Sequence, residues 1–229
     1  MSDHVAANLE QVLSRVAAAA EKAGRQVGDI QLIAISKKQA AEKVRAAFDA
    51  GQTTFGESRV QEARVKIPLL PSAVRWHFIG QLQKNKIRHA LPLFELFHSV
   101  DSLALAADMR RIAEEEGLRP RVLLEVNVAG EGSKLGFSPD SLRRDMEALL
   151  ALTRIDIEGL MTIPPLTPDP GESRPYFIAL RGLRDELERE YDVRLPQLSM
   201  GMSNDYPVAI EEGATFVRVG TAIFGDRAT

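Results

Sequence analysis

The sequence predicts an α/β fold: a single (β/α)8 barrel of the TIM type over residues 1–229, with an extra helix before its first strand. Three observations predict it. Eight short apolar segments with the length of buried strands follow one another along the chain. Amphipathic helical segments separate them, as expected where helical crossovers join parallel strands. The length of 229 residues is close to that usual for such a barrel.

The first expected element is the extra helix, over residues 5–24. Its apolar residues recur at helical spacing: Leu9, Val12, Leu13 and Val16. Gly24 follows them, and glycine commonly ends helices because it adopts the left-handed backbone conformation without strain.

The eight strands come next, each rich in β-branched or aromatic residues. They are expected at residues 31–36, 53–57, 75–80, 96–100, 121–127, 156–162, 197–200 and 216–220. Because each is followed by a segment long enough for a crossover, the pattern favours one parallel sheet that closes on itself.

Several of the connecting helices carry their own signals. Asp101-Ser102 is a typical helix start, as is Ser138 followed by Pro139. A third helix shows an apolar stripe, formed by Phe177, Leu180, Leu183 and Leu187. The proline-rich residues 164–171 lie between the sixth strand and this helix, where a long loop is expected rather than a domain boundary.

Composition excludes several classes of function. The chain carries 29 Lys and Arg against 32 Asp and Glu, a net charge of −3, which argues against nucleic-acid or anionic-membrane partners. It has no cysteine, so disulfides and thiolate chemistry are excluded. The four histidines fall on separate segments, which does not favour a metal site. The chain shows no signal-peptide pattern and no run of transmembrane length, so we expect a cytoplasmic protein.

Three segments that follow strands carry the expected chemistry. Lys37 follows the first strand, residues 199–205 (Ser-Met-Gly-Met-Ser-Asn-Asp) follow or end the seventh, and Gly220-Thr221 follow the eighth. In this fold the C-terminal ends of the strands form the active-site rim, and the last two loops often hold phosphate. Small and hydroxyl residues suit a phosphate, and a lysine amine suits an aldehyde, so the pattern predicts a pyridoxal phosphate site. The glycines alone would equally fit tight turns.

Strand alternation separates Lys37 from Lys38: if Lys37 faces the barrel mouth, Lys38 points away. In a partly apolar mouth, loss of solvation favours the neutral amine that forms a Schiff base. A solvated surface charge is the alternative for either lysine.

Arg218 shares strand parity with Gly220, so both should face the barrel interior while Val217 and Val219 face the helices. Near a cofactor ring, a fixed positive charge would keep the pyridine nitrogen unprotonated and weaken the ring as an electron sink. The alternative is a structural salt bridge to Glu57 or Glu125.

The chain resembles the pyridoxal phosphate homeostasis protein family (the YggS/PROSC group), which is related to the barrel domain of alanine racemase. The resemblance rests on motifs that run nearly end to end. They are Ile35-Ser36-Lys37, Phe55-Gly56-Glu57, Val60-Gln61-Glu62, Trp76-His77-Phe78-Ile79-Gly80 with Gln83 and Asn85-Lys86, Asn127 with Lys134 and Gly136-Phe137, Gly159-Leu160-Met161, and residues 199–205 and 218–225.

This resemblance implies a fold-type III pyridoxal phosphate protein without established turnover. It implies that Lys37 is the Schiff-base lysine and that Arg218 lies near the pyridine nitrogen. Around the phosphate it implies Ser199, Met200, Gly220 and Thr221. The other expected cofactor-binding residues are Ser58, Met161, Met202 and Ser203. Ser58 stands where the family usually has asparagine, and its side chain is shorter than that of asparagine.

Other residues keep two interpretations. His77 fits a hydrogen-bonded core histidine better than a base, and the alternation of its strand allows it to face inward or outward. Asp205 fits a cap for a helix over residues 206–212. Lys134 lies in a glycine-rich loop that could close over the mouth, or is a solvated loop lysine.

Three functions remain open on the sequence: a protein that binds pyridoxal phosphate and delivers it to apo-enzymes, a pyridoxal phosphate-dependent amino-acid racemase, and an aldolase that uses Lys37. Alanine racemases carry a second domain and a tyrosine base. Here only residues 226–229 follow Gly225, and all three tyrosines fall in predicted helices or at a helix start. We therefore expect a non-catalytic binding protein, with a monomer slightly favoured.

Overall fold

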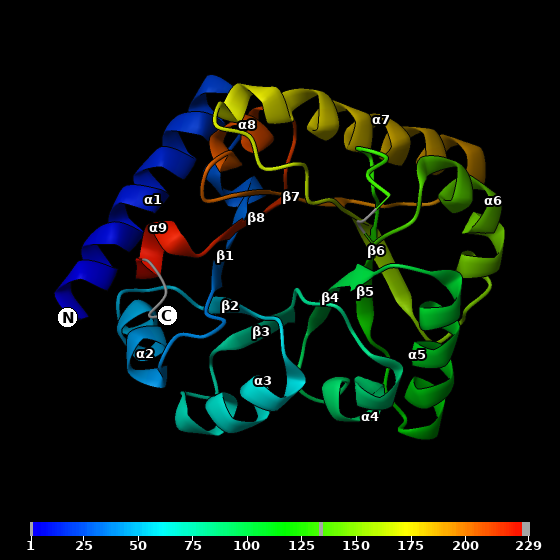
Figure 1. Ribbon diagram of the computed structural model, residues 1–229, viewed down its shortest axis with the longest axis horizontal. Helices are drawn as coiled ribbons and strands as arrows, with labels where there is room; N and C mark the ends of the chain where they lie inside the picture. Colours follow the sequence, from blue (N-terminus) through cyan, green and yellow to red (C-terminus); the bar gives the residue numbers. More distant parts are fainter. Residues whose placement is uncertain (1, 133–134, 226–229) are drawn as a thin grey trace.

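Eight parallel strands pair in sequence order and close into a barrel, with β8 hydrogen-bonded to β1 (Figure 1). The computed structural model describes residues 2–132 and 135–225. The strands are β1 Gln31–Ile35, β2 Thr54–Glu57, β3 Arg75–Phe78, β4 Leu96–Val100, β5 Arg121–Glu125, β6 Asp156–Met161, β7 Gln197–Met202 and β8 Phe216–Val219. All eight predicted strands are confirmed, most of them ending one or two residues earlier than expected, whereas β7 continues two residues further.

Helices surround this barrel on its outside (Figure 1). They are α1 Ser2–Lys22, α2 Ala41–Asp49, α3 Val60–Lys66, α4 Ile87–Ala90, α5 Leu103–Glu115, α6 Pro139–Leu150, α7 Arg174–Tyr191, α8 Tyr206–Glu211 and α9 Thr221–Phe224. Short 3-10 helices lie at Val27–Asp29, Ile67–Leu69, Lys84–Lys86 and Pro170–Ser173. The predicted caps are confirmed, since the hydroxyl of Ser102 accepts from Leu105 N and that of Ser138 from Ser141 N.

The predicted N-terminal helix is α1, and it completes the outer ring. It packs against α2, α8 and the four-residue α9, between the helices that flank β1 and β8. Leu9, Val12 and Val16 are buried there, whereas Leu13 is 44% exposed because it lies beside the buried stripe. No helix in the described residues is long and apolar enough to cross a membrane.

Two apolar cores stabilise the barrel. The larger lies between the sheet and the helices. The smaller fills the barrel interior and consists of Ile33, Ile35, Leu96, Leu123, Met161 and Phe216, with Ile79 packed against it. Because β-strand side chains alternate between these two cores, only every second residue of a strand can reach the rim of the barrel interior.

Gly159 gives a test of the closest approach between β6 and β7. A Cβ at this position would lie 1.9 Å from the backbone oxygen of Gln197, so Gly159→Ala should lower the free energy of unfolding by roughly 2–3 kcal/mol. Gly182, inside α7, has no heavy atom within 4 Å of an added Cβ, and Gly182→Ala should raise that free energy by about 0.5–1 kcal/mol. Urea unfolding measures the free energy of unfolding of both variants. Equal changes for Gly159→Ala and Gly182→Ala would contradict the close approach of β6 and β7.

Candidate functional site

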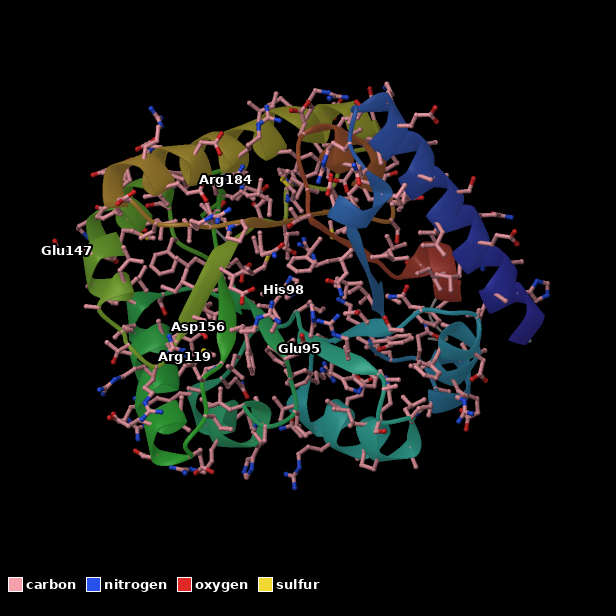
Figure 2. The ribbon with its side chains drawn as sticks, turned by 180° about the vertical axis from the view of Figure 1, so that it is seen from behind. Glu95, His98, Arg119, Glu147, Asp156 and Arg184 are labelled. Carbon is pink, nitrogen blue, oxygen red and sulfur yellow. The ribbon has the colours of Figure 1, made fainter. Side chains whose placement is uncertain are left out.

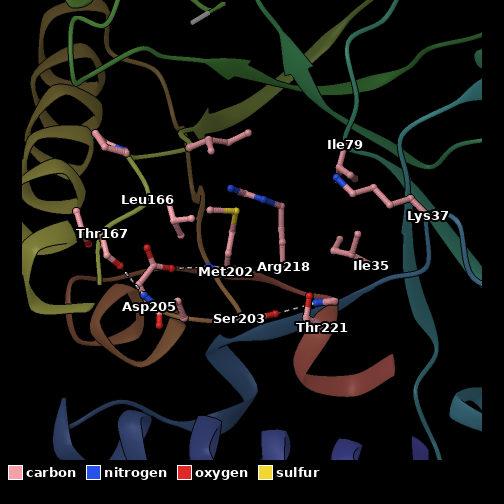
Figure 3. Close-up of a pocket in the computed structure, with 14 residues that line it drawn as sticks. Ile35, Lys37, Ile79, Leu166, Thr167, Met202, Ser203, Asp205, Arg218 and Thr221 are labelled. Atoms are coloured by element: carbon pink, nitrogen blue, oxygen red, sulfur yellow. Dashed lines mark hydrogen bonds between the residues drawn. The ribbon is translucent and has the colours of Figure 1, made fainter. Parts of the chain in front are cut away.

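A cavity of about 380 Å³ opens at the C-terminal ends of β1, β6, β7 and β8 (Figure 3). The predicted site residues that line it are Lys37, Met202, Ser203, Arg218, Gly220 and Thr221. Three segments distant in sequence thus meet at one rim, as expected. The apolar side of the lining includes Ile35, Ile79 and Leu166, which lower the dielectric constant around the polar groups.

Lys37 lies in the turn directly after β1 and is half-buried, with its side chain directed into the cavity (Figure 3). Lys38 is exposed, so the predicted separation of the two lysines is confirmed. The backbone of Lys38 has a φ of +60°, in the left-handed region that few non-glycine residues adopt. This turn, rather than strand alternation alone, directs the two lysine side chains apart.

Ser203, Gly220 and Thr221 form a small polar cradle at one end of the cavity (Figure 3). The Ser203 hydroxyl accepts hydrogen bonds from Gly220 N at 3.2 Å and from Ala222 N at 3.5 Å. The cradle therefore presents two hydroxyls, Ser203 and Thr221, and the two backbone N–H groups leave the proton of the Ser203 hydroxyl available for a further acceptor such as a phosphate oxygen.

Gly201 explains how β7 reaches the cavity. Its φ is +91°, and a Cβ there would lie 2.6 Å from the Ala209 side chain and 2.9 Å from the Tyr206 Cα. The pairing of β7 with β8 shifts register between Ser199 and Met202. This irregularity interrupts the alternation of side chains, so that the adjacent Met202 and Ser203 both line the cavity.

Arg218 is only 5% exposed, and its guanidinium makes two hydrogen bonds inside the barrel. Nη1 donates to the Ser199 hydroxyl at 2.5 Å and Nη2 to the Thr162 carbonyl at 2.8 Å. Burial lowers the pKa of Arg218 to about 10, so the guanidinium remains charged at neutral pH. Among the described residues it forms no ion pair with Glu57, which instead pairs with Lys66 at 2.6 Å.

Two carboxylates act on Arg218 through space: Glu125, at the end of β5, and Asp205. Burial raises the pKa of Glu125 to about 7; Asp101 raises it further, and the Arg218 charge opposes both effects. Among the described residues Glu125 forms no ion pair with Arg218, so the salt-bridge alternative for Arg218 is not realised there. The arginine is held by neutral oxygens and keeps its side chain at the cavity wall.

A chain of polar side chains runs from Arg218 into the barrel, where His98 lies near the centre (Figure 2). The Ser199 hydroxyl is 2.8 Å from His98 Nδ1, and His98 Nε2 is 2.9 Å from His77 Nδ1. Since Arg218 donates to Ser199, the fewest polar groups remain unsatisfied if Ser199 donates to His98 and His98 donates to His77. Both rings then carry their proton on Nε2, and His77 Nε2 has no partner in the described residues.

Four residues expected at the cofactor have side chains that do not line the cavity. Ser199 is fully buried below Arg218, and Met161 belongs to the interior core. The Met200 side chain lies in the outer core, because its strand parity is opposite to that of Ser199. Ser58 lines a separate polar pocket between β2 and β3, with Arg59, Gln83 and Lys86. These four residues stay predicted cofactor-binding residues, with side chains outside the cavity lining.

The loop between β6 and α7 supplies cavity residues that the sequence interpretation missed. Ile163, Pro165, Leu166 and Thr167 line the cavity, and Asn204 Nδ2 donates to the Thr167 carbonyl at 3.0 Å. The place of this loop in the sequence could have identified it: it follows the sixth strand and therefore emerges at the same rim as Lys37 and Thr221.

The sequence also allowed two interpretations each for His77, Asp205 and Lys134. His77 faces the interior and is a hydrogen-bonded core residue. Asp205 occupies the N-cap position of α8, as expected, but its side chain makes no cap hydrogen bond, because its Oδ1 accepts from Met202 N at 2.7 Å. Lys134 lies outside the described residues, so its loop interpretation is not tested.

The two buried histidines should stay neutral in weakly acidic solution. Burial lowers the pKa of His77 to about 3 and holds that of His98 well below its ordinary value. Because the depressed pKa favours the uncharged ring, long-range ¹H–¹⁵N spectra should show both rings neutral from pH 8 to pH 5, each protonated at Nε2. Ring protonation at pH 6, or an Nδ1-protonated His98, would contradict the direction of this hydrogen-bond chain.

Comparisons with known proteins agree with the fold and with the motifs. The family model described as alanine racemase, N-terminal domain matches residues 6–228. An alanine racemase from Clostridium difficile has a TM-score of 0.76 at 18% identity, over 99% of this chain and 58% of that one, which shows the shared barrel fold.

Closer relatives match over nearly their full length. The pyridoxal phosphate homeostasis protein of Aquifex aeolicus is 46% identical over 220 residues, 96% of each chain. That of Escherichia coli strain K12 is 37% identical over 97% of each chain. PipY of Synechococcus elongatus, solved with pyridoxal phosphate bound, is 40% identical with a TM-score of 0.85, over 96% of this chain and all of that one. The chain therefore belongs to the pyridoxal phosphate homeostasis protein family.

Proposed function

We propose that this protein binds pyridoxal 5′-phosphate and serves intracellular homeostasis of that cofactor, by capturing it and delivering it to apo-enzymes. One observation carries the proposal: Lys37 and the cradle of Ser203, Gly220 and Thr221 line the same cavity. Two comparisons support it: the relatives are pyridoxal phosphate homeostasis proteins, and PipY binds pyridoxal phosphate. We also propose that residues 1–229 act as one binding domain, as a monomer in the cytoplasm.

The residues of the cavity fit this cofactor. Bound pyridoxal phosphate supplies an aldehyde that condenses with a primary amine and releases water, and Lys37 is the lysine that lines the cavity in the described residues. The cradle offers the hydroxyls of Ser203 and Thr221 for a phosphate, and the Gly220 N–H orients the Ser203 hydroxyl by donating to it. Ile35, Ile79 and Met202 offer apolar surface for a planar ring.

Each remaining residue of the expected site receives a proposed role that follows its position. Arg218 presents a fixed positive charge to the cavity, and Ser199 holds that guanidinium from below. Met161 and Met200 support the cavity from the interior and outer cores. Ser58 faces a different pocket, so we assign its side chain no contact with the cofactor.

A binding role without turnover is supported by the positions of the three tyrosines, none of which lines the cavity in the described residues. Tyr206 is fully buried in the outer core, and the Tyr191 hydroxyl donates to the Arg143 carbonyl at 3.1 Å. Tyr176 lies near the start of α7 and does not line the cavity. A two-base racemase needs a proton acceptor on each face of its substrate, so these positions disfavour the racemase alternative. The match to the homeostasis proteins disfavours an aldolase.

Lys37 should be the covalent attachment point. After incubation with pyridoxal phosphate and reduction with borohydride, peptide mapping should find the adduct on Lys37, because this amine lines the cavity. Lys37→Ala should lose the visible absorbance of the adduct while keeping weaker binding through the cradle. Lys38→Ala is the matched control and should keep the adduct, since Lys38 is exposed. An adduct found chiefly on Lys38 or Lys84 would refute the assignment.

Delivery and turnover can be separated in one experiment. The holo-protein should restore activity to an apo pyridoxal phosphate enzyme while leaving Cα–H exchange of added amino acids in deuterated water slow. The physical reason is the fixed charge of Arg218 and the lack of a tyrosine in the described cavity lining. Racemisation or exchange at ordinary enzyme rates, on the order of 1–10³ s⁻¹, would favour the racemase. Failure to reactivate the apo-enzyme would remove the delivery role.

A further inference from the structure

A buried cluster of charged groups lies directly behind the turn that carries Lys37. At its centre is Lys66, the last residue of α3, which is only 6% exposed. Its ammonium group donates to Glu57 Oε1 at 2.6 Å, to Glu62 Oε1 at 2.8 Å and to the Ser36 carbonyl at 2.8 Å. The cluster therefore combines one cation, two carboxylates and the backbone oxygen of the residue before Lys37.

The same cluster holds the backbone after Lys37. Glu62 Oε1 accepts a hydrogen bond from Lys38 N at 2.6 Å. On the other side, the Ser36 hydroxyl donates to Glu57 Oε1 at 2.7 Å, and Ser36 N donates to Gly56 O at 3.0 Å. Thus both neighbours of Lys37 are bound to β2 and α3, while the Lys37 side chain extends into the cavity.

The backbone of this turn needs external support. Lys38 has a φ of +60°, a conformation that costs a non-glycine residue free energy unless its surroundings impose it. The carboxylate of Glu62 supplies that support through a charge-assisted hydrogen bond to Lys38 N. In an unsupported turn the chain could relax at Lys38, and the direction of the preceding side chain would change with it.

A buried cluster of this kind is a poor source of stability, because removing charges from water offsets much of their attraction. Glu57 is fully buried, its Oε2 has no hydrogen-bond partner in the described residues, and burial raises its pKa. Fixing a local conformation explains the cluster better than stability does. It also gives a role to the motifs Phe55-Gly56-Glu57 and Val60-Gln61-Glu62, which line no part of the cavity.

We propose that Glu62 and Lys66 are positioning residues for Lys37: together with Glu57 they fix the backbone on both sides of this lysine, so that its amine is presented to the cavity. This inference rests on the proposed function, because it concerns the covalent attachment of pyridoxal phosphate. Glu62 acts on the N–H that follows Lys37, and Lys66 acts on the carbonyl that precedes it.

The test compares two ligands on Glu62→Ala. Pyridoxal phosphate can react with Lys37, whereas pyridoxamine phosphate has the same ring and phosphate but no aldehyde. We expect Glu62→Ala to bind pyridoxal phosphate roughly tenfold more weakly, the equivalent of ~1.4 kcal/mol, and to bind pyridoxamine phosphate within twofold of the unmodified protein. Absorbance of the adduct and its rate of formation should fall in parallel with the first affinity.

A rescue variant tests the backbone mechanism itself. Glycine adopts a φ of +60° without strain, so Lys38→Gly added to Glu62→Ala should restore most of the adduct. Glu42→Ala is the matched control, because Glu42 is an exposed carboxylate in the first turn of α2. It should change the affinity for neither pyridoxal phosphate nor pyridoxamine phosphate. Glu62→Gln keeps an oxygen acceptor, so its affinity for pyridoxal phosphate should lie between those of Glu62→Ala and the unmodified protein. This variant replaces Glu62→Ala if Glu62→Ala does not fold.

Two results would overturn the inference: an equal loss of affinity for both ligands, which indicates a general structural role, or no loss for either. Lys66→Met is less informative, since it leaves Glu57 buried without its cation and threatens folding. Failure of the proposed function would look different, because the unmodified protein would then form no adduct at Lys37 at all.

Discussion

The hydrogen-bonded pairing of β1 with β8 is the constraint on which the cavity depends. The paired residues lie 185 positions apart in the sequence, yet Ile33 pairs with Arg218 and Ala34 with Val219. In an open sheet they would form opposite edges, and Lys37 would lie far from Gly220 and Thr221. Closure places both at one rim, where a Cβ on Gly220 would already lie 3.4 Å from the Ile35 Cβ. The fold thus assembles a site that neither end of the chain contains alone.

The polar groups inside the barrel explain why Arg218 can be buried without an ion pair in the described residues. Its guanidinium donates to Ser199 and to the Thr162 carbonyl, and Ser199 continues the chain to His98. Each oxygen is neutral, so the positive charge of the guanidinium is not cancelled at close range. The cost of burying it appears in the lowered pKa of Arg218, which still leaves it charged at neutral pH.

Much of the fold was predictable because the strand segments are short, apolar and regularly spaced, and the rim follows from barrel geometry. The inward direction of Arg218 followed from simple alternation. The contributions of Met202 and Ser203 did not, because Gly201 and the register shift interrupt that alternation. The cavity residues of the β6–α7 loop were missed because a proline-rich loop has no periodicity to indicate which side chains face inward.

The charges near Lys37 position its backbone, whereas the charge of Arg218 acts on the cavity itself. Lys66 and its two carboxylates bind backbone atoms beside Lys37, whereas Arg218 presents its charge to the cavity directly. The histidines below Arg218 stay neutral because burial lowers the pKa of each, so they add no charge to the barrel interior near neutral pH. Arg218 itself stays charged near neutral pH, whereas Glu125, whose pKa burial raises to about 7, titrates there, and the geometry of Lys37 depends on a separate cluster. A protein that captures a reactive aldehyde benefits from this separation, since the amine can be positioned precisely where no tyrosine base lines the cavity in the described residues.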